Sequence, residues 1–408
     1  MTNNWAGNLT YGALMELRPT SVEELQEVVA ASTRIRPLGS RHSFNRIADT
    51  DAAQVSVERL PDGFDIDGAT VTVGAGVRYG ELVGRLDAAG WALHNLASLP
   101  HISIAGAIAT GTHGSGDRNG SLATAVAGLQ YVTADGDLEE IRRGDPDFDA
   151  FVVSLGLLGV VTQVTLDIEP TYDVHQHVFE NLSWAAIHEN FDDITSSAYS
   201  VSMFTDWGDG ATTVWLKSRS DVRTELFDAT PAIANINPVP GAPAAFATHQ
   251  LGEVGPWWNR IPHFQLEFTP SSGEELQTEY LLPRQHALEA IDAVRELAAQ
   301  VRPLLLISEI RTIAGDSLWL SPSHDTDCVA LHFTWRQDIP AVTALVPVLD
   351  DALAPFAARP HWGKLFETTP ERLHAAYPKL APFRKLVERL DPTGKFSNQL
   401  TRQWLGQT

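Results

Sequence analysis

Two segments rich in glycine and hydroxyl side chains constrain this chain of 408 residues more than any other feature. Residues 38–43 are LGSRHS, and residues 97–116 are ASLPHISIAGAIATGTHGSG. Glycine allows backbone conformations closed to other residues, and successive N–H groups of such a loop can form a nest for an anion. Alone, the first segment could equally be a polar turn with a surface histidine. Together, the two predict one large phosphate-bearing ligand held between them.

The composition is typical of a soluble globular protein, with 44% hydrophobic and 20% charged residues. Fifty-one acidic and 29 basic side chains give a formal net charge of −22. Because this charge repels phosphate backbones and anionic lipids, we expect neither nucleic acid nor membrane as a partner. A neutral substrate is favoured over an anionic one for the same reason.

The chain has one cysteine, Cys328, so it has no internal disulfide framework and no cysteine-rich metal site. The first twenty residues contain no apolar run of signal-sequence length, and no 18 consecutive apolar residues follow later. We therefore expect a cytoplasmic protein, and we expect it to be a monomer.

The length predicts two domains, and the pattern of elements changes after Pro170. A capping box at Ser21 predicts an early helix, and Asp135-Gly136 predicts the turn of a hairpin over residues 130–141. Other strands are expected at residues 71–74, 159–166, 304–313 and 328–336, and helices at 81–90, 284–299, 339–353 and, as the last, 382–390. Residues 231–247, rich in proline and alanine, are expected to form a surface loop.

Three other motifs have simpler explanations than a ligand site. Residues 74–80 contain three glycines after a strand, but the third falls one position late for a dinucleotide fingerprint, which favours a plain turn. His175 and His177 share one face of a strand but have no third metal ligand nearby in the sequence. Lys364 and Lys395 follow glycines without the spacing of a Walker loop. No metal site is predicted.

Two later strands each place polar side chains on one face. Glu309 and Arg311 are two residues apart and therefore point the same way, as do His332 and Thr334. Such pairs would make a polar floor for a polyol. The alternative, a surface salt bridge beside a core histidine, stays open on this pattern alone.

Residues 38–43 and the TGTHGSG of residues 110–116 together resemble the vanillyl-alcohol-oxidase type of FAD-binding flavoprotein. The resemblance implies a two-domain α+β fold, with an FAD-binding domain at residues 1–170 and an antiparallel-sheet substrate domain at 171–358. Residues 359–408 would return to the FAD domain.

The resemblance narrows to the bacterial alditol (xylitol) oxidases, to which three segments are similar: NWAGN at residues 4–8, HNLASLPHIS at 94–103 and HWGK at 361–364. In that family, the histidine that matches His42 is bonded covalently to FAD. Such a bond would retain the flavin and raise its reduction potential.

The resemblance also implies the roles of the site residues. Catalysis would rest on Arg311, Lys364, Glu309 and His332, and substrate binding on Ser98, Glu309, Arg311, Thr334 and Lys364. The FAD contacts would be Gly39, Ser40, Arg41, His42, Ser43, Ser98, Ser103, Gly106, Thr110, Gly111, Thr112, His113, Val161 and His361.

The implied reaction oxidises the terminal primary hydroxyl of an alditol to the aldose by hydride transfer to flavin N5, and O₂ is reduced to hydrogen peroxide. Arg311 and Lys364 would stabilise the alkoxide charge that develops on the substrate oxygen. An aldonolactone oxidase or dehydrogenase is the alternative within the family, and a non-catalytic polyol-binding protein is the alternative of another class. Ala97 matches a position that influences oxygen access in related lactone-oxidising enzymes, which leaves the electron acceptor open.

Overall fold

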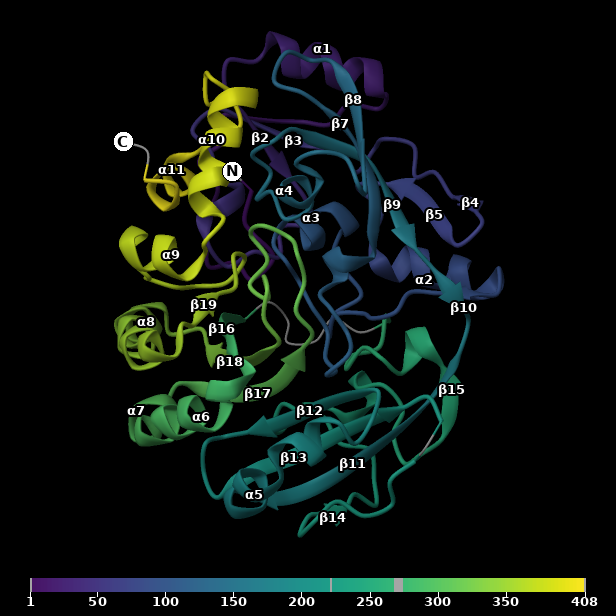
Figure 1. The fold of residues 1–408 in the computed structure, drawn as a ribbon, viewed down its shortest axis with the longest axis vertical. Coiled ribbons are helices and arrows are strands. Elements are labelled where there is room, and N and C mark those ends of the chain that lie inside the picture. Colours follow the sequence, from purple (N-terminus) through teal and green to yellow (C-terminus); the bar gives the residue numbers. More distant parts are fainter. Residues whose placement is uncertain (1, 221, 268–273, 407–408) are drawn as a thin grey trace.

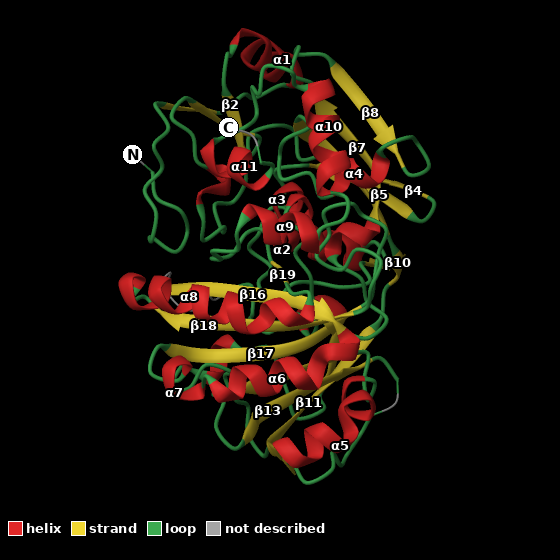
Figure 2. Ribbon diagram, turned by 60° about the vertical axis from the view of Figure 1, so that its left-hand side comes forward, coloured by secondary structure: helices red, strands yellow, loops and turns green. Residues whose placement is uncertain are grey.

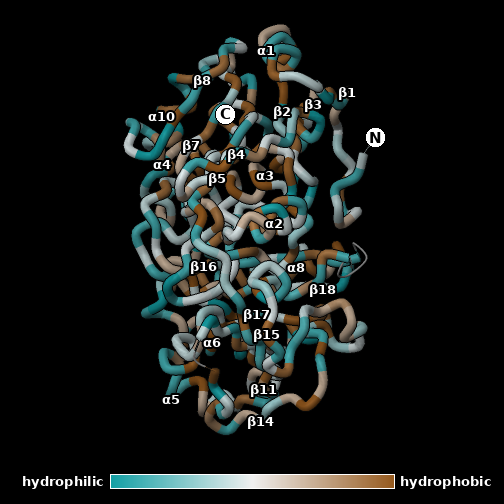
Figure 3. Tube along the Cα trace, turned by 90° about the vertical axis from the view of Figure 1, so that its right-hand side faces the viewer, coloured by the Kyte–Doolittle hydropathy of each residue, from teal (hydrophilic) through white to brown (hydrophobic). Residues whose placement is uncertain are grey.

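The computed structural model describes residues 2–220, 222–267 and 274–406. In Figure 1, the elements up to residue 167 and the last helices, in yellow, form the upper half, and the strands of residues 173–336, in teal to green, form the lower half. Each half has its own group of buried hydrophobic side chains, which includes Leu82 in the upper half and Leu331 in the lower. Figure 3 shows hydrophobic stretches, in brown, running through the middle of both halves.

The upper half contains two small sheets and a two-stranded pair. Their strands are β1 (Met15–Leu17), β2 (Ile35–Leu38) and β3 (Ala53–Ser56), then β4 (Asp65–Asp67), β5 (Thr70–Gly74), β7 (Val126–Val132), β8 (Leu138–Arg142) and β9 (Val160–Asp167), and the pair β6 (Trp91–Ala92) and β10 (Glu169–Pro170). The first sheet is parallel, in the order β1-β3-β2, and the second is antiparallel, in the order β4-β5-β9-β7-β8.

The lower half is built on a nine-stranded antiparallel sheet. Its strands are β11 (Asp173–Ser183), β12 (Ser200–Thr205), β13 (Gly210–Ser218), β14 (Thr230–Pro231), β15 (Val254–Pro256), β16 (Glu275–Pro283), β17 (Leu305–Ile313), β18 (Cys328–Arg336) and β19 (Arg359–Pro360). The order is β14-β11-β13-β12-β17-β18-β16-β19, and β15 pairs with β11. The sequence assigns residues 359 and 360 to the C-terminal segment, but here they form an edge strand of this sheet.

The helices cover both halves. They are α1 (Val22–Ala31), α2 (Tyr79–Ala88), α3 (Ile104–Ala109), α4 (Phe148–Val152), α5 (Trp184–Thr195), α6 (Ala287–Glu296), α7 (Ala298–Val301), α8 (Ile339–Leu353), α9 (Pro370–Ala376), α10 (Leu380–Leu390) and α11 (Gln399–Trp404). Figure 2 shows α5, α6 and α8 on one face of the nine-stranded sheet. The opposite face of its central strands is therefore left for the site described below.

Within the described residues, the segment Ile339–Phe356 is long and apolar enough to cross a membrane, judged by length and composition. It consists of α8 and the turn after it. Val342, Leu345, Val346, Leu349 and Leu353 from α8 are buried against the sheet in the lower core. This packing accounts for the apolar side chains on that face, whereas Ile339 and Val348 of the same helix are exposed.

The sequence predicts several elements correctly, including α1, α8, β18 and the hairpin of β7 and β8, whose Gly136 has a φ of 91°. The predicted helix at 81–90 is α2, and Gly90 ends it with a φ of 83°. The prediction was incomplete elsewhere. It gave no element for the parallel sheet, α5, β16 or α9, and it took α10 as the last helix although α11 follows.

The second glycine-rich segment is not a continuous loop, because α3 lies inside it. Ser103 is the N-cap of α3, and the helix presents Ile104 and Ile108 to the upper core. The expected surface loop at residues 231–247 also differs from the prediction. It is largely irregular, but Asn237 and Phe246 line the cavity described below.

Candidate active site

A cavity of about 340 Å³ lies between the two glycine-rich segments and the nine-stranded sheet. Its volume falls within the range of small-molecule and cofactor sites. The predicted site residues that line it are Gly39, Ser40, Arg41, His42, Ser43, Ser98, Ser103, Gly106, Thr110, Thr112, His113, Val161, Glu309, Arg311, His332, Thr334, His361 and Lys364. Gly111 does not line it; this glycine has a φ of 68° and packs near Pro322.

The two glycine-rich segments are joined by a reciprocal pair of hydrogen bonds. The backbone N–H of Ser103 donates to Ser40 Oγ at 2.9 Å, and the backbone N–H of Ser40 donates to Ser103 Oγ at 3.2 Å. A Cβ atom at either Gly39 or Gly106 would lie 2.8 Å from Ser103 Oγ. Both positions therefore require glycine for the segments to meet.

The first segment forms an anion nest. The backbone N–H groups of Arg41, His42 and Ser43 have no hydrogen-bond partner in the described part of the chain. Arg41 has a φ of 65°, which is costly for a residue other than glycine and turns the chain at this point. Three successive free donors in such a turn suit the oxygens of a phosphate group.

The side chain of Arg41 does not add a free charge to this nest. Its Nη2 atom donates to Glu16 Oε1 at 2.6 Å, so the guanidinium is paired with a carboxylate from β1. The sequence predicts Arg41 as an FAD contact, but its guanidinium is already engaged by Glu16. The backbone N–H of Arg41, rather than its side chain, is therefore the group available to contact FAD.

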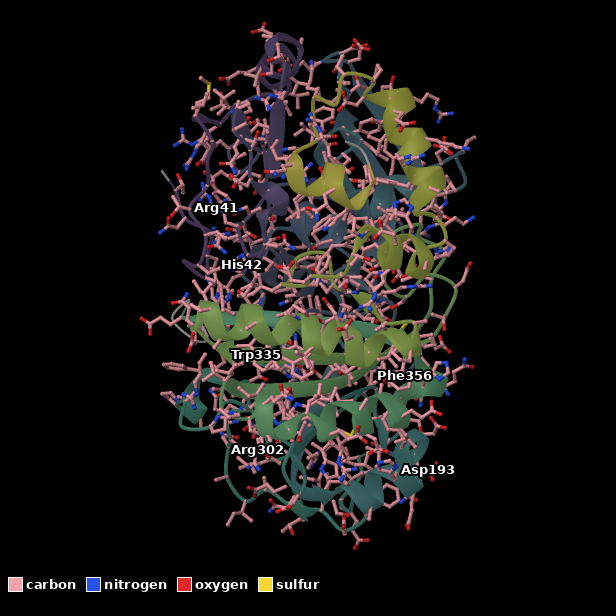
Figure 4. All side chains as sticks on the ribbon, turned by 90° about the vertical axis from the view of Figure 1, so that its left-hand side faces the viewer. Arg41, His42, Asp193, Arg302, Trp335 and Phe356 are labelled. Atoms are coloured by element: carbon pink, nitrogen blue, oxygen red, sulfur yellow. The ribbon has the colours of Figure 1, made fainter. Side chains whose placement is uncertain are left out.

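His42 lies where this loop meets the cavity. Figure 4 shows Arg41 and His42 in the N-terminal half, with His42 nearer to the sheet that carries Trp335. The imidazole stacks on Trp5 with ring centroids 5.1 Å apart, and its Nδ1 atom is 3.0 Å from Ser40 Oγ. Burial lowers the pKa of His42 to about 3, so the ring is neutral and keeps a lone pair at physiological pH.

The floor of the cavity is a row of polar side chains across three adjacent strands. Glu279 on β16 is paired in register with His332 on β18, and His332 with Glu309 on β17. Arg311 lies two residues from Glu309 on the same face. Glu309 and Arg311 are only 5% and 6% exposed, so the alternative of a surface salt bridge is excluded.

Arg311 lies between two carboxylates. Its Nη2 atom is 2.5 Å from Glu279 Oε1, its Nε atom is 3.5 Å from Glu309 Oε1, and its Nη1 atom is 3.4 Å from Ser98 Oγ. Burial disfavours the Arg311 charge, but Glu309 and Glu279 outweigh burial and raise the pKa of the guanidinium. Burial would raise the pKa of both carboxyl groups, but His113 and Arg311 lower that of Glu279, and Arg311 and His263 lower that of Glu309. The cluster is therefore ionised.

Lys364 approaches the floor from the segment after β19. Its Nζ atom donates to Gln277 Oε1 on β16 and lies 5.0 Å from the centre of the Phe44 ring. Burial lowers the pKa of Lys364 to about 8, although the charges of Glu279 and Glu275 oppose the shift. The ammonium form therefore predominates at neutral pH.

Three histidines complete the walls. His332 Nδ1 is 3.4 Å from Glu279 Oε2, and its Nε2 atom is 3.1 Å from Thr334 Oγ1. His113 Nε2 lies 3.3 Å from Glu279 Oε1, and the rings of His113 and His361 are 6.0 Å apart. Burial lowers the pKa of His332, with Glu279 opposing, and lowers that of His361 to about 3.

Several residues of the floor were not predicted from the sequence. Glu275, Gln277 and Glu279 alternate along β16 as Glu309 and Arg311 do along β17, so the two-residue spacing could have revealed them. His263 also lines the cavity, but it lies in irregular chain between β15 and β16, where no periodicity marks it.

The structure also shows the positions of two motifs that the sequence analysis interpreted without a ligand, residues 74–80 and the pair His175 and His177. Gly76 is required for packing, because a Cβ there would lie 2.6 Å from the Val57 carbonyl oxygen, but Gly76 and Arg78 also line the cavity. The plain-turn interpretation is therefore incomplete. His175 Nδ1 is 3.1 Å from the Gly252 carbonyl oxygen. The described residues contain no group of three or more His, Cys, Asp or Glu side chains that could hold a metal ion.

Comparison of the sequence with known proteins identifies the family of this chain. Residues 13–142 match the FAD binding domain family, and residues 273–405 match the D-arabinono-1,4-lactone oxidase family. Alditol oxidase from Streptomyces sp. (strain IKD472) is 51% identical over 409 residues, which cover 98% of each chain. The chain belongs to the alditol oxidase family. L-gulono-1,4-lactone dehydrogenase from Mycobacterium tuberculosis is a more distant relative, 30% identical over 99% of each chain.

Solved structures confirm the two-domain FAD-binding fold. A solvent-stable cholesterol oxidase has a TM-score of 0.78, at 15% identity, over 99% of this chain and 97% of the other. A cholesterol oxidase from B. sterolicum has a TM-score of 0.76, at 15% identity, over 99% and 96%. Members of the alditol oxidase family are FAD-dependent oxidoreductases, and this chain is one of them.

The residues present fit FAD. The nest of three backbone N–H groups at Arg41, His42 and Ser43 provides donors for a diphosphate. Gly39 and Gly106 both line the cavity where the two segments meet at Ser103, and a Cβ on either glycine would press against Ser103 Oγ; the junction of these glycines is called the cradle. The cavity continues from this cradle to Glu309 and the rest of the floor, so one dinucleotide could reach both ends.

Proposed function

We propose that this chain oxidises the terminal primary hydroxyl of linear alditols of the xylitol and sorbitol class to the corresponding aldose, with O₂ reduced to hydrogen peroxide. The observation that carries the proposal is the ionised floor of Glu309, Arg311 and Glu279, which shares one cavity with the His42 loop and Lys364. The 51% identity to an alditol oxidase supports the same substrate class. Glu309 and Glu279 would repel an anionic substrate, which favours a neutral polyol.

In this reaction, bound FAD supplies the acceptor for the hydride and passes the electrons to oxygen. The chain itself has to bind the alcohol, take up its hydroxyl proton and stabilise the charge that develops on its oxygen. Arg311 and Lys364 are the cations placed to stabilise that charge, because both line the cavity. Arg311 is buried and Lys364 is partly buried, so water screens their charges only weakly. Glu309 accepts a hydrogen bond from a substrate hydroxyl and orients the polyol.

His332 is the base for the hydroxyl proton in this proposal. Burial keeps its imidazole neutral, and Glu279 Oε2 lies 3.4 Å from its Nδ1 atom. A proton on Nδ1 directed at Glu279 leaves Nε2 with its lone pair, and Glu279 would stabilise the imidazolium after proton transfer. Thr334 Oγ1, 3.1 Å from Nε2, marks the side from which a hydroxyl reaches this nitrogen.

We also propose that His42 is bonded covalently to FAD, since its neutral ring lies beside the nest. Replacing it in His42→Ala should leave FAD bound only by non-covalent contacts. Acid precipitation should then release the flavin of the variant into the supernatant and leave that of the wild type in the pellet. Flavin released equally from both proteins would contradict the bond. Trp5→Phe, which keeps a ring against His42, serves as the control that retains the bond.

The substrate assignment is tested by comparing peroxide release on xylitol with release on a sugar lactone. We expect the alditol to be oxidised and the lactone to be a poor substrate, because the charged floor matches hydroxyl donors rather than a lactone ring. Turnover of the lactone alone would favour the aldonolactone oxidases or dehydrogenases. A colourless purified protein would favour the non-catalytic polyol-binding alternative.

The acceptor is proposed to be oxygen. Ala97, at the position that the resemblance links to oxygen access, lines the cavity and is 8% exposed. A cytoplasmic location and a monomeric state are likewise proposals that follow from the sequence.

A further inference from the structure

Two buried side chains, Lys217 and His263, form a hydrogen-bonded relay that ends at Glu309, and the mechanism above does not use them. Lys217 on β13 is 1% exposed, and His263 is 4% exposed. Lys217 Nζ is 3.0 Å from His263 Nδ1, and His263 Nε2 is 2.7 Å from Glu309 Oε1. The three groups therefore connect the interior of the sheet with the floor of the cavity.

The ionised carboxylate of Glu309 fixes the direction of these hydrogen bonds. A carboxylate only accepts, so His263 Nε2 carries the proton and donates to Glu309 Oε1. The other ring nitrogen, Nδ1, then keeps its lone pair and accepts from Lys217 Nζ. The carbonyl oxygens of Ile261 and Pro262 accept the other donors of Lys217 and hold the ammonium in place.

Aromatic side chains pack around His263, so Lys217 and His263 are almost completely shielded from water although His263 lines the cavity. Phe204 and Trp215 meet its ring edge to face, at centroid distances of 5.2 Å and 5.3 Å. Burial lowers the pKa of His263 to about 4 and that of Lys217 to about 7. A buried amine is costly, and a well-packed apolar residue at position 217 would avoid that cost.

We propose that Lys217 and His263 are positioning residues for alcohol oxidation, holding one carboxylate oxygen of Glu309 so that the other accepts a substrate hydroxyl. This inference rests on the proposed alcohol substrate. Glu309 Oε1 is engaged by His263 and approached by Arg311 Nε, whereas Oε2 has no hydrogen-bond partner among the described residues. Lys217 holds the His263 ring through Nδ1, and the Nε2–H of that ring in turn holds the carboxylate of Glu309.

The kinetic test uses two substitutions of the same histidine. In His263→Gln, the amide nitrogen reaches the position of Nε2 and can still donate to Glu309. In His263→Asn, the amide reaches only the position of Nδ1, so it meets Lys217 but not Glu309. We expect His263→Asn to raise KM for xylitol by about tenfold or more, with kcat less affected, whereas His263→Gln restores most of the wild-type KM.

A second test observes the tautomer directly and needs no substrate. In holoenzyme labelled with ¹⁵N-histidine, we expect the His263 resonances to show an unprotonated Nδ1 and a protonated Nε2. Lys217→Met should leave Nε2 protonated, because Glu309 still accepts from it, but should shift the Nδ1 resonance, because the donor to Nδ1 is gone. Ser202→Ala is the matched control, since Ser202 Oγ lies 3.4 Å from His263 Nε2 but does not set its tautomer.

The outcomes separate this inference from the proposed function. Equal KM values for His263→Asn and His263→Gln, in proteins that oxidise xylitol and retain their flavin, would overturn the positioning role. A protonated Nδ1 in the wild-type spectrum would overturn it as well. The expected tautomer in a protein that oxidises no alditol would instead overturn the proposed substrate and, with it, the role assigned to Glu309.

Discussion

Lys364→Met is expected to lower kcat for xylitol by about 100-fold to 1000-fold, the usual cost of removing one donor to a developing oxyanion. Methionine keeps the length of the side chain but not its charge. The variant should keep its yellow colour and its melting temperature, because Lys364 Nζ has only Gln277 as a hydrogen-bond partner among the described side chains. Steady-state peroxide release and the visible spectrum measure both properties.

The pH profile gives a second measurement of the same role. Because burial lowers the pKa of Lys364 to about 8, its cation is present below that pH and lost above it. Wild-type kcat/KM should therefore fall as pH rises through about 8. Arginine stays protonated, so any activity left in Lys364→Arg should not fall in this range. Lys385→Met, at an exposed position on α10, is the control. An unaltered kcat in Lys364→Met would remove this lysine from the mechanism.

Arg311→Met is expected to affect both activity and stability. It leaves Glu279 and Glu309 buried without their common cation, and breaking a buried pair in this way costs about 3–5 kcal/mol of unfolding free energy. It also removes a donor to the developing alkoxide, so kcat should fall by about 100-fold or more. Chemical denaturation and peroxide release measure the two effects.

The pH dependence of stability at this site should weaken in the same variant. In the wild type, Arg311 and the neighbouring histidines lower the pKa of Glu309 and Glu279, so the contribution of these carboxylates is present above the ordinary carboxyl pKa and lost on acidification. Without Arg311, both carboxylates lose a common cation and their pKa values should rise, so the variant should lose less stability on acidification than the wild type.

The control for Arg311→Met is Arg302→Met. Arg302 pairs with Asp206 at 2.9 Å, and both side chains are exposed at the surface. Loss of an exposed pair costs about 0–1 kcal/mol. Adding Glu279→Gln to Arg311→Met should recover stability but not activity. A fully stable and fully active Arg311→Met protein would contradict the assigned role of the cluster.

The sequence predicts the site better than it predicts the contacts within it. Period-two spacing correctly placed Glu309 with Arg311 and His332 with Thr334, because side chains alternate across any strand. The same spacing does not reveal register between strands. Glu279 is therefore the partner that the sequence missed, although it makes the shortest contact with Arg311.

Other contacts were hidden because they join residues far apart in the chain. The pairing of Arg41 with Glu16 depends on how β1 lies against the nest, and that parallel sheet was not predicted from strands of three or four residues. His263 meets Lys217 through irregular chain, where no periodicity exists to be read. Short strands and irregular segments are fixed by tertiary packing rather than by local preference.

The central claim is that one cavity holds FAD beside a floor built to bind an alcohol. Anaerobic mixing of the purified holoenzyme with xylitol, followed through the visible flavin absorbance, tests it most directly. We expect xylitol to bleach the flavin, a sugar lactone to leave it yellow, and admitted air to restore the colour with release of peroxide. Bleaching by the lactone but not by xylitol, or a protein without flavin absorbance, would contradict the account.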